Sequence, residues 1–241
     1  MKICNVFGYC GSNNKHSRTY EIMNQFCDNL SKLYKDDLKL NISIFQSKDV
    51  NLKACQGCSQ CFSDGVCPQD EVDDMKTMKK LMEEADVIII GTPVYLKSVS
   101  SQTKLFLDRI AYWSHLFKLS NKLGIVLVTS ASNGFNETIN YLYNILIPFG
   151  ILVVNTISID SKSSYLTLNK EIEYTKTIID QYIFEDKLRS SKDLEKAFLA
   201  YKQLYLKKAL SPAERKYWEK EGLDRCDEFV DYINIVRKTR L

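Results

Sequence analysis

Five short apolar runs alternate with four helical patterns in the first 160 residues, and this alternation constrains the fold more than any other feature. The runs read KICNVFGY, LKLNISIFQ, DVIIIGTPVY, LGIVLVTSA and GILVVNTISI, at residues 2–9, 38–46, 86–95, 123–131 and 150–159. Continuous runs of Val and Ile are typical of strands that are buried on both faces, as in a parallel sheet. Only the second run alternates with period two.

Between these runs, apolar residues recur at helical spacing within residues 17–34, 70–84, 106–117 and 136–146. Strands that alternate with helices indicate βαβ units with right-handed crossovers. We therefore predict an α/β fold for residues 1–160, with a doubly wound, five-stranded parallel sheet that is covered by helices.

After Asp160 the strand signals stop, and we predict a helical C-terminal extension over residues 161–241. Its first ten residues, SKSSYLTLNK, are interpreted as a polar connector. The sequence SPAE at residues 211–214 predicts a helix start with a capping box. An apolar stripe at helical spacing would bury against the main domain or a second subunit, and it consists of Cys226, Phe229, Val230, Ile233 and Val236.

Composition is that of a soluble globular protein, with 45% hydrophobic and 26% charged residues. The net charge of +3 over 241 residues gives no argument for nucleic acid as a partner. No run of about 18 apolar residues predicts a membrane span, and the N-terminal stretch is not a convincing signal peptide. We therefore expect a cytoplasmic protein that binds neither nucleic acid nor a membrane.

Four of the eight cysteines lie close together in the segment KACQGCSQCFSDGVCPQDEVDDM, residues 53–75. Cys55, Cys58, Cys61 and Cys67 form a C-x2-C-x2-C-x5-C pattern. In a reducing cytosol such a pattern indicates metal ligands or redox thiols rather than structural disulfides. Two-residue spacers and the Cys67–Pro68 pair favour a 4Fe-4S cluster. Zinc remains an alternative, although its structural sites usually have two separated knuckles. Free thiols or disulfides are the other alternative.

The remaining titratable candidates have plainer interpretations. Cys4, Cys10, Cys27 and Cys226 lie on strand or helix patterns and are expected to be core or surface residues. His115 lies in an apolar helical pattern and is expected in the core. The acidic residues 70–74 are expected to stabilise a helix N-terminus through the helix dipole rather than to bind a divalent ion.

Three loops follow strands at the edge where an open parallel sheet collects its ligands. The first, GYCGSNNKHSRT at residues 8–19, combines hydroxyl donors with a helix start, which suits a phosphate. The other two begin at residues 91 and 129 and could hold a planar heterocycle by backbone contacts. The alternative interpretation is that all three are ordinary polar turns between strands and helices.

Two of these segments resemble a known family. GTPVYLKSVSSQTKLFLDR, residues 91–109, resembles the G-T-P-V-Y…S…K-x-F-x-D-R stretch of the NADPH-dependent FMN reductase family, which has a flavodoxin-like fold. The cysteine segment is similar to that of the family's iron–sulfur flavoprotein branch, where it holds a 4Fe-4S cluster. The resemblance covers roughly residues 1–155. Asn13 and Asn14 replace the usual Pro and Arg of the phosphate loop, and Leu96 and Lys97 stand where small residues are usual.

This resemblance implies the strand order 2-1-3-4-5, with FMN at the switch point between the first and third strands. It places the FMN phosphate on Ser12, Asn14, Ser17, Arg18 and Thr19. It places the isoalloxazine ring among Pro93, Val94, Tyr95, Ser98, Thr129 and Ser130. The cluster ligands would be Cys55, Cys58, Cys61 and Cys67, and no side chain need act as a catalytic acid or nucleophile.

The function that follows is redox, because the flavin and the cluster carry the chemistry and the protein positions them. We expect an FMN-dependent oxidoreductase that moves electrons from a reduced carrier, NAD(P)H or ferredoxin, to a small-molecule acceptor. A cluster-free NAD(P)H:flavin or quinone reductase is one alternative, and a non-catalytic redox sensor or partner-binding flavoprotein is another. The resemblance also implies a homodimer or larger homo-oligomer, with Phe229 and Ile233 in a candidate contact.

Overall fold

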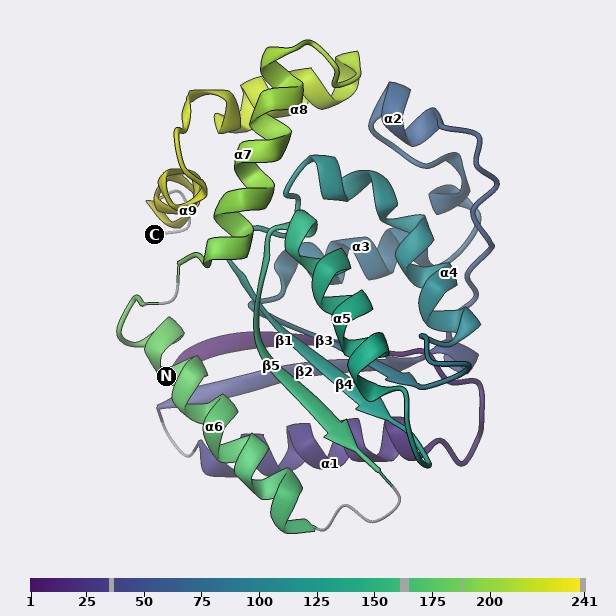
Figure 1. Cartoon of the computed structure of the whole chain (residues 1–241). Coiled ribbons are helices and arrows are strands. Elements are labelled where there is room, and N and C mark those ends of the chain that lie inside the picture. The colour runs from purple at the N-terminus through teal and green to yellow at the C-terminus, as the bar shows by residue number, and fades with distance from the viewer. Residues whose placement is uncertain (35–36, 161–164, 188, 239–241) are drawn as a thin grey trace.

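The computed structural model describes residues 1–34, 37–160, 165–187 and 189–238. Within them, five strands form one parallel sheet in the order β2-β1-β3-β4-β5 (Figure 1). The strands are β1 (Lys2–Cys10), β2 (Leu38–Gln46), β3 (Val87–Pro93), β4 (Lys122–Thr129) and β5 (Ile151–Ile159). The predicted fold class and strand order are therefore confirmed.

Residues 38–46, the run that alternates with period two, form an edge strand. Residues 86–95, the run that is dense in Val and Ile, contribute a central strand. Strand β2 lies at one edge of the sheet, whereas β3 lies between β1 and β4. In β3 the four residues Val87–Ile90 are all buried, because helices cover both faces of the sheet.

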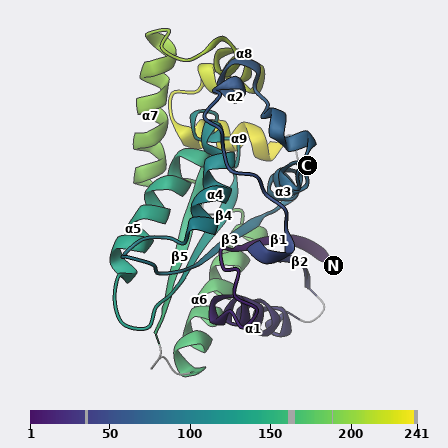
Figure 2. The ribbon, with the colours of Figure 1, turned by 90° about the vertical axis from the view of Figure 1, so that its right-hand side faces the viewer.

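The helices of the family-like region are α1 (Arg18–Leu33), α2 (Gln60–Asp64), α3 (Met75–Glu84), α4 (Ser101–Arg109) and α5 (Phe135–Leu146). Those of the extension are α6 (Tyr165–Ile183), α7 (Lys192–Leu206), α8 (Pro212–Glu221) and α9 (Phe229–Lys238). Helices α1 and α6 cover one face of the sheet, and α3, α4 and α5 cover the other (Figures 1 and 2).

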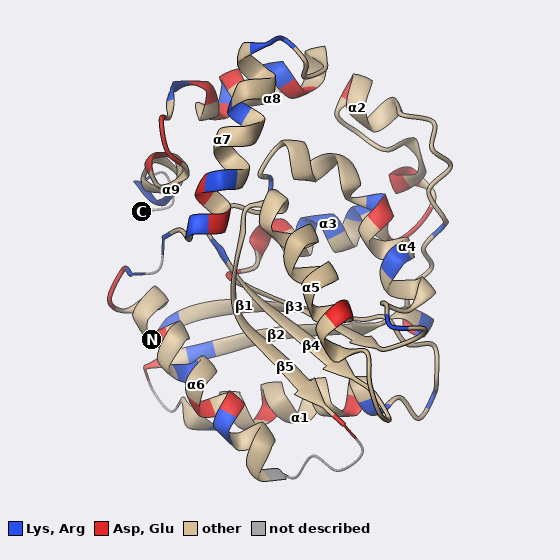
Figure 3. Ribbon diagram, in the orientation of Figure 1, with Lys and Arg blue, Asp and Glu red and all other residues tan. Residues whose placement is uncertain are grey.

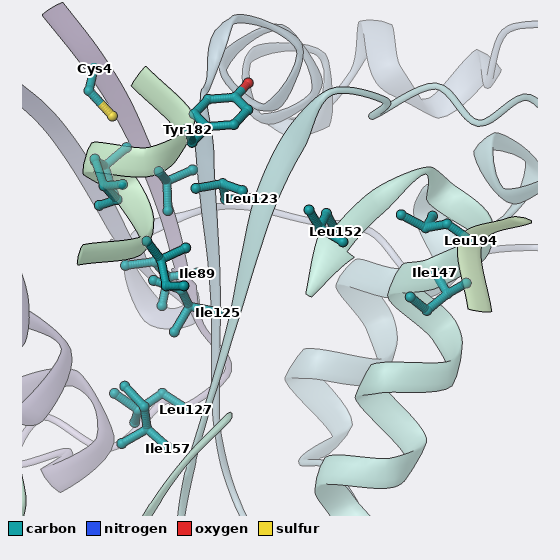
Figure 4. Close-up of a cluster of buried hydrophobic side chains, with 14 of the residues drawn as sticks. Cys4, Ile89, Leu123, Ile125, Leu127, Ile147, Leu152, Ile157, Tyr182 and Leu194 are labelled. Carbon is teal, nitrogen blue, oxygen red and sulfur yellow. The ribbon is translucent and has the colours of Figure 1, made fainter. Parts of the chain in front are cut away.

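Alternate strand residues point to opposite faces and divide the core in two. Ile89, Ile125 and Leu127 belong to the cluster on the α1 and α6 side (Figure 4), whereas Ile88 and Ile90 belong to the other. The first cluster continues without a break into the C-terminal helices, where Phe117 contacts the rings of Phe198, Tyr201, Trp218 and Phe229.

Two expectations about local structure need correction. The helix expected over residues 106–117 ends at Arg109, and a 3-10 turn, Ala111–His115, follows. Phe117 then adopts a positive φ of 48°, which sends its ring to the other core cluster. The helical spacing of these apolar residues therefore indicated which positions are buried, but the residues do not belong to one helix. The connector expected at residues 161–170 is already helical from Tyr165, while residues 161–164 lie outside the described ones.

The stripe at the C-terminus is buried within the chain itself. Phe229 and Ile233 have no exposed surface, and both belong to the cluster that contains the sheet residues. The suggestion that these two side chains form a subunit contact is therefore wrong. Ser211 caps α8, and Glu214 completes the predicted capping box.

Candidate functional site

The loops that follow β1, β3 and β4 meet at the carboxyl edge of the sheet. The Gly11 N–H donates to the Gly91 carbonyl at 2.9 Å, which joins the first loop to the end of β3. The Val94 N–H donates to the Thr129 carbonyl at 2.8 Å, which joins β3 to β4. The structure thus brings together the three loops in which the sequence placed the flavin.

Ser17 caps helix α1, and its hydroxyl oxygen accepts from the Tyr20 N–H at 3.2 Å. The N–H groups of the first turn of a helix have no acceptor within the helix. The N-terminus of a helix therefore favours the binding of an anion. Ser12 and Ser17 are both buried, and Asn14 turns the loop by accepting from the His16 N–H at 2.9 Å.

Thr19 and Arg18 make contacts that the sequence did not suggest. The Thr19 and Thr129 hydroxyls share a buried hydrogen bond of 2.6 Å, which holds α1 against the end of β4. The Arg18 guanidinium donates to the Asp160 carbonyl at 2.5 Å. Because a guanidinium carries five N–H donors, this contact leaves donors for an anion.

Two residues that sequence analysis missed fix the shape of the first loop. Gln46, buried at the end of β2, donates from Nε2 to the carbonyls of Ser12 and Asn14 at 2.9 and 2.7 Å. Ser100 caps α4 and donates to the Gly11 carbonyl at 2.5 Å. The sequence did offer one signal, because Gln46 is a polar residue at the end of an apolar strand.

Gly11 has to be a glycine because two elements meet there. A Cβ at this position would lie 1.9 Å from the Thr103 hydroxyl oxygen and 2.8 Å from that of Ser100. This close approach brings the start of α4 directly against the loop that follows β1.

The turn after β3 carries the candidate ring contacts. Pro93 ends the strand, and the backbones of Tyr95 and Ser98 pair across the turn. Between them Leu96 and Lys97 adopt positive φ values of 49° and 60°, a region that disfavours residues with a Cβ. The backbone conformation thus explains why small residues suit these positions. Tyr95 and Leu96 are exposed apolar side chains.

The loop after β4 lies against this turn. Ser130 donates to the Asn133 carbonyl at 2.7 Å, and Gly134 reaches φ 84° as α5 begins. A Cβ on Gly134 would come within 2.7 Å of Val94, and Lys97 pairs with Glu137 of α5 at 3.3 Å. The Val94 and Ser130 loops therefore form one contiguous surface.

The cysteine segment runs from Lys53 to Met75 and leaves the same edge of the sheet. Cys55 and Cys58 are exposed, Cys61 is half-buried and Cys67 is buried. Positive φ values at Gly57 and Ser59 give the tight bends that the short spacers need. Burial raises the pKa of Cys61, and the charges of Cys67 and Cys55 add to this effect.

Arg109, the last residue of α4, closes the base of this segment. Its fully buried guanidinium donates to the Lys53 carbonyl at 2.8 Å and to Asp70 at 2.8 Å. It also forms a buried ion pair with Asp73, which accepts the Lys53 N–H at 2.9 Å. The two ends of the cysteine segment are thereby joined through one side chain, which we call the Arg109 clasp.

The clasp adds a second role to the acidic residues 70–74, which were expected to stabilise a helix N-terminus. Asp73 does accept from the Met75 N–H at the start of α3, as a dipole contact would, but it also pairs with Arg109. Burial acts to raise the pKa of Asp73, yet the hydrogen bonds from Arg109, Lys53 and Met75 lower it overall. Arg109 lies 36 residues away from Asp73, so local sequence gave no signal of the pair.

The donor set of the segment, four thiols, is one that a four-iron cluster or a zinc ion accepts. In the described part of the chain, no group of three or more His, Cys, Asp or Glu side chains converges on a point where one ion could bind. A zinc ion needs four ligands within about 2.3 Å of one atom, whereas a four-iron cube keeps its thiolates further apart. The Arg109 Nε atom is buried and has no hydrogen-bond acceptor among the described residues.

The other cysteines are core residues, as expected. Cys4, Cys10, Cys27 and Cys226 are buried. Burial raises the pKa of Cys10 and that of Cys27 to about 12, so neither thiol ionises near neutral pH. His115 is only half-buried, and its Nδ1 lies 2.6 Å from a Glu214 oxygen.

Comparisons with known proteins agree with this geometry. The sequence model of the NADPH-dependent FMN reductase family matches residues 4–163, so the chain belongs to that family. An iron–sulfur flavoprotein of Archaeoglobus fulgidus is 33% identical over 61% of this chain and 64% of its own length. The iron–sulfur flavoprotein MJ1083 of Methanocaldococcus jannaschii is 40% identical over 44% of this chain and 55% of its own length. The similarity to the iron–sulfur flavoprotein branch is thus confirmed, although the chain matches less than two thirds of either relative.

A solved structure shows the same fold. The FMN-dependent NADH-azoreductase of Bacillus anthracis, in complex with FMN, superimposes with a TM-score of 0.54 over 74% of this chain and 99% of its own. Its sequence is 11% identical, so this likeness concerns the fold alone. None of the described helices is both long enough and apolar enough to cross a membrane.

Proposed function

We propose that this protein is an FMN-dependent oxidoreductase of the iron–sulfur flavoprotein type. It would transfer electrons between a reduced carrier, NAD(P)H or ferredoxin, and a small-molecule acceptor through FMN and a 4Fe-4S cluster. Family membership and the relatives named iron–sulfur flavoprotein support this proposal. FMN exchanges one or two electrons and a cluster exchanges one, so the pair converts between the two modes.

One observation carries the proposal, namely that helix α4 links the two candidate cofactor sites. Its start contacts the first loop through Ser100 and Gly11, and its last residue forms the Arg109 clasp. Nine helical residues span about 13 Å. The phosphate loop and the base of the cysteine segment are therefore held at a fixed, short separation by one rigid element.

The FMN phosphate would be held at the start of α1 by the helix N–H groups, by Ser12, Asn14 and Ser17, and by the free donors of Arg18. Because the Thr19 hydroxyl is engaged with Thr129, Thr19 would contribute through its backbone. The isoalloxazine ring would cover Tyr95 and lie among the remaining predicted ring contacts, which are Pro93, Val94, Ser98, Thr129 and Ser130.

The cluster would be held by Cys55, Cys58, Cys61 and Cys67. Arg109 fixes both ends of this segment, and Gln69 adds a hydrogen bond of 3.0 Å from its Nε2 to the Ala54 carbonyl. A loop that is closed in advance loses little entropy when it orders around a ligand. We further propose that the protein acts in the cytoplasm as a homodimer or larger homo-oligomer, which sedimentation at two protein concentrations tests.

The test is flavin, iron and sulfide analysis of protein purified without oxygen, followed by NAD(P)H turnover with an artificial acceptor. A protein without bound FMN would refute the proposal. FMN without iron would instead support a cluster-free NAD(P)H:flavin or quinone reductase.

A point variant tests the phosphate site directly. Ser17→Ala removes the cap of α1 and a hydroxyl donor to the phosphate, so FMN should bind about ten- to a hundredfold more weakly. The matched control is Ser191→Ala, because Ser191 caps α7 in the same way through the Leu194 N–H, away from the site. Equal FMN affinity in the two variants would place the phosphate elsewhere.

A further inference from the structure

A pocket of about 510 Å³ lies between the cysteine segment, α3, the 3-10 turn Ala111–His115 and α8. Its volume falls within the range of about 300–1,000 Å³ that is usual for small-ligand sites. Cys61 contributes to one wall, whereas none of the predicted phosphate or ring contacts lines it. The pocket is therefore separate from the proposed flavin site.

The lining of the pocket is aromatic. Tyr112, Trp113 and Tyr217 contribute rings, and Lys79 lies beneath them with its ammonium 4.9 Å from the centre of the Tyr112 ring. Lys79 is almost fully buried, and it also pairs with Asp70 at 2.5 Å. The pocket is thereby connected through Asp70 to the Arg109 clasp.

The rim of the pocket is positively charged. Six lysines and four carboxylates line it, which leaves a surplus of two positive charges. Three of the carboxylates are already engaged, Asp70 by Arg109 and Lys79, Glu83 by Lys118, and Glu214 by His115. Lys76, Lys80 and Lys220 form exposed pairs with neighbouring carboxylates that do not line the pocket. Figure 3 shows blue segments, which are Lys or Arg, on both α3 and α8. Lys216 is exposed, and no carboxylate of the described residues lies within ion-pair distance of its ammonium.

The C-terminal extension builds one side of this pocket. Helix α8 lies beside α2 (Figure 2), where the Ser211 hydroxyl donates to the Phe62 carbonyl at 2.5 Å. The Phe62 ring also contacts His115, which pairs with Glu214 of α8. The family match ends at residue 163, so this wall is an addition to the family domain.

We propose that this pocket binds a planar aromatic anion, that is, an aromatic ring system that carries a carboxylate, sulfonate or phosphate. The rings of Tyr112, Trp113 and Tyr217 would pack on the ligand's apolar surface, where aromatic contacts add to area burial. Lys216 and Lys220 would attract its acidic group. The proposal does not depend on the flavin, and the only proposed cluster ligand that lines the pocket is Cys61.

The test is calorimetric titration of the full chain with naphthalene-2-sulfonate. Saturable binding of one molecule per chain is expected, with weaker binding of the neutral 2-naphthalenemethanol. Reversing the rim charges with Lys216→Glu and Lys220→Glu together should weaken sulfonate binding about tenfold, since each exposed pair contributes up to about 1 kcal/mol. The matched control is Lys192→Glu with Lys207→Glu, two exposed lysines, at the first position and at the C-cap of α7, that do not line the pocket.

A second variant separates a pocket from a merely basic surface. Ala213 lines the pocket in the first turn of α8, and Ala213→Phe would fill part of the volume without altering charge. Loss of naphthalene-2-sulfonate binding in this variant supports the proposal. Unchanged binding in Ala213→Phe, equal weakening in the α7 control, or no saturable binding to the unmodified chain would each overturn it.

Discussion

Replacing Arg109 by lysine keeps the positive charge of the clasp but removes the planar guanidinium and its several hydrogen bonds. The guanidinium reaches the Lys53 carbonyl, Asp70 and Asp73 at once, which a compact ammonium on a shorter stem cannot do. At least two of these hydrogen bonds should be lost, one of them to a charged group. With about 1.5 kcal/mol for each, Arg109→Lys should cost about 3 kcal/mol.

This cost should appear first in the cysteine segment, because the clasp joins its two ends. For a chain of this size, about 3 kcal/mol corresponds to a fall in Tm of about 6–12 °C. Local opening of residues 53–74 should become about a hundredfold more frequent, since 1.4 kcal/mol is a factor of ten.

Hydrogen exchange followed by mass spectrometry measures this opening segment by segment. We expect exchange to accelerate first and most visibly within residues 53–74, while β3, which is buried on both faces, stays protected on the same timescale. Arg225→Lys is the matched control, because Arg225 is mostly exposed and forms a single surface pair at 4.0 Å. If exchange in the cysteine segment stays as in the unmodified chain, Arg109 does not hold its ends together.

Two further variants and one labelling experiment follow from the structure. Leu96→Gly should raise Tm by about 2–4 °C, because Leu96 is fully exposed at φ 49° and a glycine relieves about 1 kcal/mol of backbone strain; thermal melting checks this, and a lower Tm would contradict it. In metal-free native protein, iodoacetamide at pH 8 should label Cys55 and Cys58 and spare Cys10, whose pKa burial raises to about 12; early labelling of Cys10, read by peptide mass spectrometry, would argue against the buried first loop. Asp73→Asn should make the free energy of unfolding less dependent on pH in the acid range. The native pKa of Asp73 is lowered, so the ionised side chain stabilises the fold above its ordinary pKa of 3.8, and this stabilisation is lost as pH falls below that value. Denaturant titrations at about pH 7 and about pH 3 measure this difference.

The sheet was predictable because its information is local. A run such as Val87–Ile90 can be buried on both faces only in a central strand, and period-two alternation in residues 38–46 suits an edge. Ser17 and Ser211 likewise cap the helices that follow them, since a cap depends on residues three positions apart.

The contacts that sequence analysis missed connect residues far apart in the chain. Arg109 pairs with Asp73, and Gln46 holds the loop after β1 across the sheet. Helical spacing in residues 106–117 misled for a related reason, because Phe106 and Phe117 are buried in different clusters. A periodic apolar pattern reports which positions are covered, and only the fold decides what covers them.

The ring of Phe117 has a consequence for any attempt to work with the family-matched residues 4–163 alone. It is completely buried, and the four aromatic rings around it all come from α7, α8 and α9. Excising everything after residue 163 would uncover this ring, together with the sheet side chains beneath it, to water. Such a fragment should aggregate, since large exposed apolar patches promote association between molecules. The C-terminal helices thus shield from solvent an apolar surface that the flavodoxin-like region cannot cover by itself.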